Sequence, residues 1–190
     1  TTDSIAAFIA TGAGEVGEAV TSLGSTLVLK LVSDKPVFSS ELGVYSHRLG
    51  ETWLAGGASN SGGRVLLKYF NQAQLDEMTP KLDADTDTGL HYYPLVEAGE
   101  RFPRNDPQLQ PLLAPRPNND VKFFQAMLEG MAAIEAEGYQ ALVQLGAPSP
   151  TQVFTAGGGS INPAWRKIRE HKLGVPVTTA EHSEASYGSA

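Results

Sequence analysis

Residues 151–177 read TQVFTAGGGSINPAWRKIREHKLGVPV, and this stretch determines how the rest of the chain is interpreted. A β-prone run at 153–155 precedes three consecutive glycines at 157–159, and Pro163 opens a predicted helix that carries Trp165. The pattern predicts a strand, a glycine loop, a helix and a further strand. Glycines let the main chain approach a flat ligand, and the helix would turn its first N–H groups toward that ligand. A nucleotide suits this arrangement, although for the glycines alone a plain strand-to-helix connection is the better explanation.

The composition is that of an ordinary soluble globular domain, with 190 residues, 41% hydrophobic and 18% charged. The formal net charge of −7 disfavours binding to nucleic acids or to anionic membranes. The chain has no cysteine, which excludes disulfides, thiolate zinc sites and a cysteine nucleophile. Without a signal sequence or an apolar run of about 20 residues, we expect a cytoplasmic protein that binds small ligands.

Both ends of the chain suggest a piece of a longer polypeptide. The chain begins at Thr1 without methionine, and it stops at Ala190, inside a helix that is expected to start at Ser183. We therefore expect further sequence on both sides.

The first 33 residues hold two candidate features. Asp3 directly precedes an alanine-rich apolar run, which is the position of a helix N-cap. Residues 18–32 form two β-rich runs that meet at Gly24, Ser25 and Thr26, so a hairpin is predicted. The backbone N–H groups of such a turn can converge on an anion without any lysine.

The middle of the chain predicts a sheet with helices. Strands are expected at 44–49 and 52–54, then a glycine-rich loop at 56–63 and a helix from about Val65 to Phe70. A further strand is expected at 92–96, and the five prolines between 99 and 118 predict an extended connection. The longest helix should begin at Asn119 or Asp120 and end at Gly138, with a second helix at 139–145.

Two local motifs are misleading. Asp87, Thr88 and Gly89 match the aspartic-protease triplet, but acidic residues precede them where that site needs a buried apolar strand, so a solvated loop is expected. The four histidines are scattered and show no metal-ligand spacing; they are His47, His91, His171 and His182.

Several of these segments together resemble the FGGY carbohydrate kinases. In the stretch at 151–177, the family's adenosine motif is matched by Gly158, Gly159 and Asn162, and its G-x-P-V sequel by 174–177. The resemblance extends along the whole chain, through Asp3, Ala6 and Ala7, then Ser22, Gly24, Ser25 and Thr26, then Gly99, Glu100, Arg101, Pro103, Asp106 and Pro107, and last Glu184 and Gly188. It is closest to the D-ribulose kinases of cyanobacteria and plant plastids.

The resemblance implies an α/β fold of the ribonuclease-H-like kind found in sugar kinases, actin and Hsp70, with a mixed sheet flanked by helices. Residues 1–190 would be the C-terminal domain, without the N-terminal sugar-binding domain and the last helix. The implied reaction transfers the γ-phosphoryl group of ATP, with Mg²⁺, to a ketopentose, and D-ribulose is the expected acceptor. A plant protein of this kind would lie in the plastid stroma.

The resemblance also assigns roles to single residues. Asp3 would be the general base, and Gly24, Ser25 and Thr26 would hold phosphates. Trp165 would frame the adenosine with the Gly158, Gly159 and Asn162 positions, although a core tryptophan explains it equally well. Asn60 and Gly62 would line the nucleotide cleft, and no metal ligand is assigned. The alternative is a non-catalytic, actin-like or Hsp70-like ATP-binding interaction module, and the 190-residue chain by itself is expected to be inactive.

Overall fold

The computed structural model describes residues 3–180, and for Asp3 and Ser4 only the backbone. It contains one mixed sheet of six strands in the order β3-β4-β2-β1-β5-β6. Strand β1 pairs with β2 antiparallel and with β5 parallel, and β6 continues the parallel part. The strands are β1 Glu18–Leu23, β2 Leu27–Ser33, β3 Tyr45–Leu49, β4 Thr52–Ser59, β5 Gln152–Ala156 and β6 Val177–Thr179. The predicted mixed α/β fold is confirmed.

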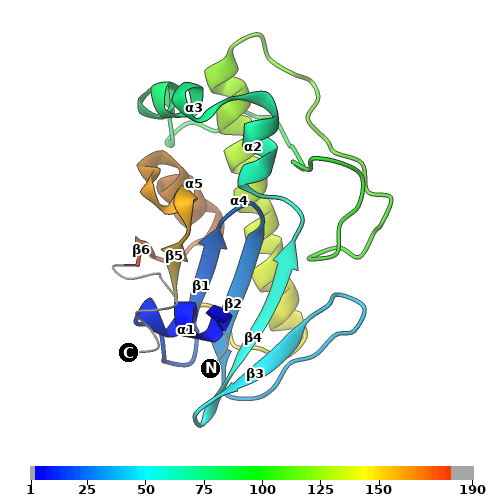
Figure 1. The fold of residues 1–190 in the computed structure, drawn as a ribbon, viewed down its shortest axis with the longest axis vertical. Helices are drawn as coiled ribbons and strands as arrows, with labels where there is room; N and C mark the ends of the chain where they lie inside the picture. The colour runs from blue at the N-terminus through cyan, green and yellow to red at the C-terminus, as the bar shows by residue number, and fades with distance from the viewer. Residues whose placement is uncertain (1–2, 181–190) are drawn as a thin grey trace.

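Helices cover both faces of this sheet (Figure 1). The α-helices are α1 Asp3–Ala10, α2 Gly63–Tyr69, α3 Gln72–Met78, α4 Asp120–Gln144 and α5 Pro163–Leu173, with short 3₁₀ turns η1 Thr79–Lys81 and η2 Gly158–Ile161. The larger core lies between α4 and the sheet face of Leu29 and Leu31. On the other face a smaller core joins Phe8 of α1 to Val20 and Val32, as the alternation of strand side chains requires.

Helix α4 is a single helix of 25 residues, so the predicted end at Gly138 and the separate helix at 139–145 were wrong. A Cβ atom on Gly138 would lie 2.7 Å from Cδ2 of Leu29 and 2.9 Å from Cε1 of Phe102. The glycine therefore allows close packing of the helix on the sheet, and the helix passes through it because the buried apolar stripe continues to Leu142.

Two strand predictions also need correction. The glycines at 56 and 57 belong to β4 and not to a loop, because they pair with Lys30 and Leu29 of β2. Residues 92–96 form no strand, and Tyr93 makes only an isolated bridge to Leu112. Local apolar patterning does not separate these cases, since only the neighbouring segment decides them.

No helix between residues 3 and 180 combines the length and the apolar character needed to cross a bilayer. The predicted helix at Ser183, together with His182, Glu184 and Gly188, lies outside the described residues.

A buried ion pair ties α4 to α5. Arg169 Nε lies 2.7 Å from a Glu135 carboxylate oxygen, and both side chains are 1% exposed. Arg169 also donates to Thr155 of β5, and Glu135 accepts from Thr21 of β1, which itself bonds to Tyr139. Burial alone would lower the pKa of Arg169, but Glu135 beside it holds that pKa above its usual value. Two helices and the two central parallel strands are thus fixed to one another.

Replacing only one residue of this ion pair should lower the free energy of unfolding more than replacing both. Arg169→Met leaves the Glu135 carboxylate buried and unpaired, so we expect the free energy of unfolding to fall by about 3–5 kcal/mol. The double change R169M/E135L should recover most of that loss, because no buried charge remains. Urea denaturation of the single and double variants measures both effects, and an equal loss in the two would contradict this account.

Candidate functional site

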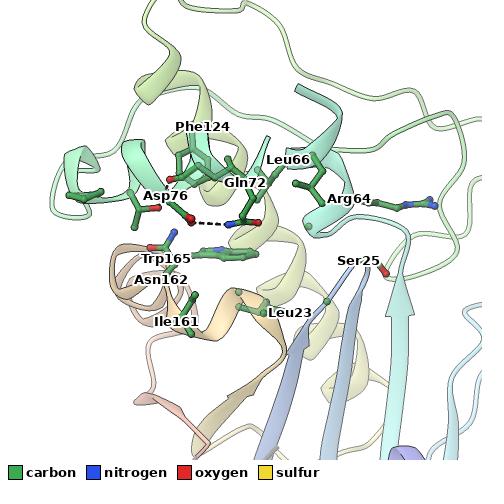
Figure 2. A pocket seen from close by; sticks show the side chains of 18 residues that line it. Leu23, Ser25, Arg64, Leu66, Gln72, Asp76, Phe124, Ile161, Asn162 and Trp165 are labelled. Atoms are coloured by element: carbon green, nitrogen blue, oxygen red, sulfur yellow. Dashed lines mark hydrogen bonds between the residues drawn. The ribbon is translucent and has the colours of Figure 1, made fainter. Parts of the chain in front are cut away.

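A cavity of about 520 Å³ opens at the carboxyl ends of β1 and β5. Three walls enclose it: the β1–β2 turn, helices α2 and α3, and the η2 turn with the start of α5 (Figure 2). Ligands of α/β proteins bind at this edge of a sheet. Among the predicted site residues, the structure brings together Gly24, Ser25, Gly158, Gly159, Asn162 and Trp165 in the cavity lining.

The β1–β2 turn presents unpaired backbone donors. Its carbonyls at Gly24 and Ser25 accept from the N–H groups of Gly63 at 2.9 Å and of Arg64 at 3.3 Å. The N–H groups of residues 24–26 have no partner within the described part of the chain. A turn with free N–H groups and fixed carbonyls is suited to hold an anion.

Gly62 packs closely against the backbone of this turn. A Cβ atom there would lie 2.6 Å from the Ser25 carbonyl oxygen and 2.6 Å from Cα of Thr26, and its φ of +152° also favours glycine. Gly62 and Thr26 lie outside the cavity lining, so their contact with a nucleotide stays a prediction.

Asn60 forms its hydrogen bonds with the extended connection. Its backbone N–H donates to Glu100 at 2.8 Å, and its side-chain amide donates to the Gly99 carbonyl at 3.1 Å. Glu100 is buried and also accepts from Ser59 and Tyr93. Asn60 therefore anchors the extended connection to the end of β4 and is absent from the cavity lining, and its role toward a nucleotide stays a prediction.

The glycine loop and the indole of Trp165 are packed together. A Cβ atom on Gly159 would lie 2.5 Å from Cζ3 of Trp165, whereas Gly158 has no atom within 4 Å of its would-be Cβ. Trp165 is 3% exposed, so it is a core residue whose remaining surface forms part of the cavity wall. Its buried Nε1 has no hydrogen-bond partner within residues 3–180.

The side-chain amide of Asn162 uses its oxygen in a hydrogen bond to the backbone, and its nitrogen has no partner within the described residues. Its Oδ1 accepts from the N–H of Trp165 at 3.0 Å and caps α5, and Pro163 follows as the first helical residue. The start of α5 is therefore already partly satisfied, contrary to the expectation of open N–H groups. The Nδ2 group of Asn162 has no partner within the described residues and remains available as a donor.

The sequence analysis missed the wall formed by α3. Gln72 Nε2 donates to Asp76 Oδ1 at 2.8 Å on this short helix, and both residues line the cavity (Figure 2). The capping box of Asn71 and Gln74 is the one local signal that predicts the helix. Two large apolar side chains also face the cavity while strongly exposed, Leu67 at 57% and Ile161 at 81%. A flat apolar ligand between these walls would remove that surface from water.

Asp3 is the first residue of α1. Its side chain lies outside the described part of the structure, so its catalytic role stays a prediction.

Comparison with known proteins decides the family. Residues 19–190 match the C-terminal domain of the FGGY family of carbohydrate kinases. The chain belongs to this family. The match confirms the predicted family and favours a sugar kinase domain over the actin-like or Hsp70-like alternative.

Individual relatives agree with this FGGY assignment. A xylulose kinase from Brucella ovis superposes with a TM-score of 0.84 at 25% identity, over 98% of this chain and 40% of its own. A glycerol kinase from Plasmodium falciparum, solved with ADP, shares the fold with a TM-score of 0.79 at 16% identity, over 97% of this chain and 39% of its own. An L-fuculokinase from Escherichia coli K12 is 31% identical over 68 residues, which cover 36% of this chain and 14% of the relative. The chain thus spans about 40% of the length of these solved kinases.

The two cavity glycines offer a matched pair of variants. Gly159→Ala would push a methyl group into the Trp165 ring, so we expect the free energy of unfolding to fall by about 1–3 kcal/mol through overpacking. Gly158→Ala meets open space and should change stability by less than about 0.5 kcal/mol. Chemical denaturation followed by tryptophan fluorescence compares the two, and similar values would show that the loop does not pack on the indole as described.

Proposed function

We propose that this chain is the nucleotide-binding part of an ATP-dependent sugar kinase whose acceptor is a ketopentose. The expected ketopentose is D-ribulose. The observation that carries the proposal is the cavity itself, whose lining is largely apolar and includes a turn with free N–H groups and a glycine loop. Membership of the FGGY family supports phosphoryl transfer to a carbohydrate. The similarity to a xylulose kinase supports a ketopentose acceptor, while the resemblance of the sequence motifs favours D-ribulose.

The residues present fit an adenine nucleotide. The volume of about 520 Å³ lies within the range of small-ligand pockets. The free N–H groups at Gly24 and Ser25 would hold the β- and γ-phosphates, and the walls at Leu67 and Ile161 would cover the base. When bound, Mg²⁺ supplies charge neutralisation on the phosphate oxygens.

Two side-chain amides that line the cavity would read the edge of the base. The Asn162 amide has committed its oxygen to capping α5, so it presents Nδ2 as a donor. The Gln72 amide donates one of its two N–H groups to Asp76, and its Oε1 is available as an acceptor (Figure 2). Adenine offers the complementary set, an N6 amino donor and a ring-nitrogen acceptor, whereas guanine places the acceptor O6 where adenine has the amino group. With Gln72 Oε1 opposite the group at position 6 of the purine, the proposed nucleotide is ATP and not GTP.

In the proposed reaction a sugar hydroxyl oxygen attacks the γ-phosphorus, the bond from that phosphorus to the bridging oxygen breaks, and ADP leaves. Asp3 would take the hydroxyl proton as general base. The free N–H groups of the β1–β2 turn would stay in place and stabilise the charge on the transferring group.

Asp3→Asn tests the general base in the longer kinase that contains this chain. Because the amide cannot accept the proton, kcat should fall by about 10²- to 10⁴-fold while the Kd for ADP stays within twofold. Coupled-enzyme assays with a panel of ketoses and calorimetric titration with ADP measure the two quantities. Near-normal kcat in this variant would reject Asp3 as the base, and turnover with no ketose would reject the proposed acceptor.

The Gln72 amide can be tested on the 190-residue chain by titration with ADP and GDP. Gln72→Leu removes the fixed acceptor, so the preference for ADP over GDP should shrink by about 3- to 10-fold, the value of one neutral hydrogen bond. The control is Gln110→Leu, at an exposed residue of the extended connection that does not line the cavity. An unchanged preference in Q72L would overturn this recognition, while a wild-type chain that binds neither nucleotide would overturn the cavity assignment itself.

The chain alone should bind ADP weakly and phosphorylate no sugar, because catalysis in this fold requires two domains that close over the substrates. Measurable kinase activity of the purified 190-residue chain would contradict this.

A further inference from the structure

A second cavity of about 200 Å³ lies beside β4. Strand β3 pairs with β4 only as far as Gly56, and the cavity occupies the edge of β4 that follows. The lining contains Lys30 from β2, Tyr45 from β3, Arg101 from the extended connection and no acidic residue.

Lys30 lies in this cavity without an anionic partner. Its stem packs over Gly56, where a Cβ atom would come within 2.7 Å of Lys30 Cδ and 3.0 Å of Nζ. Its Nζ lies 5.3 Å from the centre of the Tyr45 ring, and within residues 3–180 it forms no ion pair. Burial lowers the pKa of Lys30, and no carboxylate offsets that effect. Placing an ammonium group here costs stability unless something compensates its charge.

Two further donors reach the same cavity. The backbone N–H of Arg101 donates to Glu100 at 3.0 Å and fixes the residue at the cavity edge, while its guanidinium forms no ion pair within the described residues. Alternate residues of β4 turn their N–H groups to this outer edge, where Gly56 is opposite Tyr45. The N–H of Ala58 points to the same edge, beyond the last β3 partner.

Glu100, next to Arg101 in the chain, is one candidate to neutralise these cations. Its two oxygens already accept four hydrogen bonds, from Ser59, Asn60, Tyr93 and Arg101, and the carboxylate does not line the cavity. The positive groups therefore face an opening with no anion of the described chain in it.

We propose that this cavity is a second ligand site, separate from the nucleotide cavity, which binds the phosphoryl group of inorganic phosphate or of a small phosphate monoester. Two cations and a backbone N–H complement a tetrahedral dianion, for which charge-assisted hydrogen bonds are strong. A volume of about 200 Å³ accommodates such a group but is less than half that of the nucleotide cavity. Lys30 and Arg101 would hold the oxygens, and Tyr45 would form the apolar wall.

Calorimetric titration of the chain with inorganic phosphate, and separately with methyl phosphate, tests this site. Phosphate that enters the nucleotide cavity is recognised by comparison with Lys30→Met, because Lys30 does not line that cavity. Lys30→Met keeps the length and apolar stem of the side chain, and it should weaken phosphate binding at least tenfold. Arg101→Gln should weaken it several-fold. The matched control is Lys122→Met, an exposed lysine on α4, which should bind phosphate like the wild type.

Saturable binding of phosphate that K30M loses and K122M keeps would support the site, and the methyl phosphate titration then shows whether it admits a monoester. Circular dichroism confirms that K30M is folded. No saturable binding of either titrant by the wild-type chain would overturn the proposal. Equal binding by K30M and K122M would do the same.

Discussion

The structure depends on the buried pair of Arg169 and Glu135. A guanidinium and a carboxylate that are both removed from water must satisfy each other, and here Thr155 and Thr21 complete their hydrogen bonds. Because the four residues belong to α5, α4, β5 and β1, the pair fixes the relative position of the elements on one side of the nucleotide cavity. The glycine loop and Asn162 precede α5, so their geometry follows from it.

A second constraint is space, and glycine supplies it in several places. Gly138 lets α4 approach the sheet, Gly62 lets the chain pass behind the β1–β2 turn, and Gly159 lets the loop rest on the Trp165 ring. In each case a Cβ atom would come closer than 3 Å to a neighbouring atom. The glycines that a single sequence suggests as flexible are therefore, at these positions, requirements of close packing.

In the candidate site, several residues use one polar group in a hydrogen bond within the chain and leave another polar group without a partner in the described residues. The carbonyls of the β1–β2 turn are bonded to the start of α2 while its N–H groups remain open, and the amides of Asn162 and Gln72 each use one atom internally. Such an arrangement is preorganised, because the groups that would meet a ligand are held before it arrives. The cavity beside β4 differs, since its cations Lys30 and Arg101 have no internal partner within the described residues.

The sequence by itself determined the hairpin at the front of the chain and the strand, glycine loop, helix and strand near its end, because turn residues, caps and periodicity act over a few neighbouring residues. It also carried the motifs from which the family was recognised. The tertiary structure alone decided that Gly138 lies inside a helix, that Gly56 and Gly57 lie inside a strand, and that Gln72 of α3 and Asn162 line the same cavity. Those outcomes depend on what a distant segment places against each residue, and long-range packing leaves no periodic mark in the local sequence.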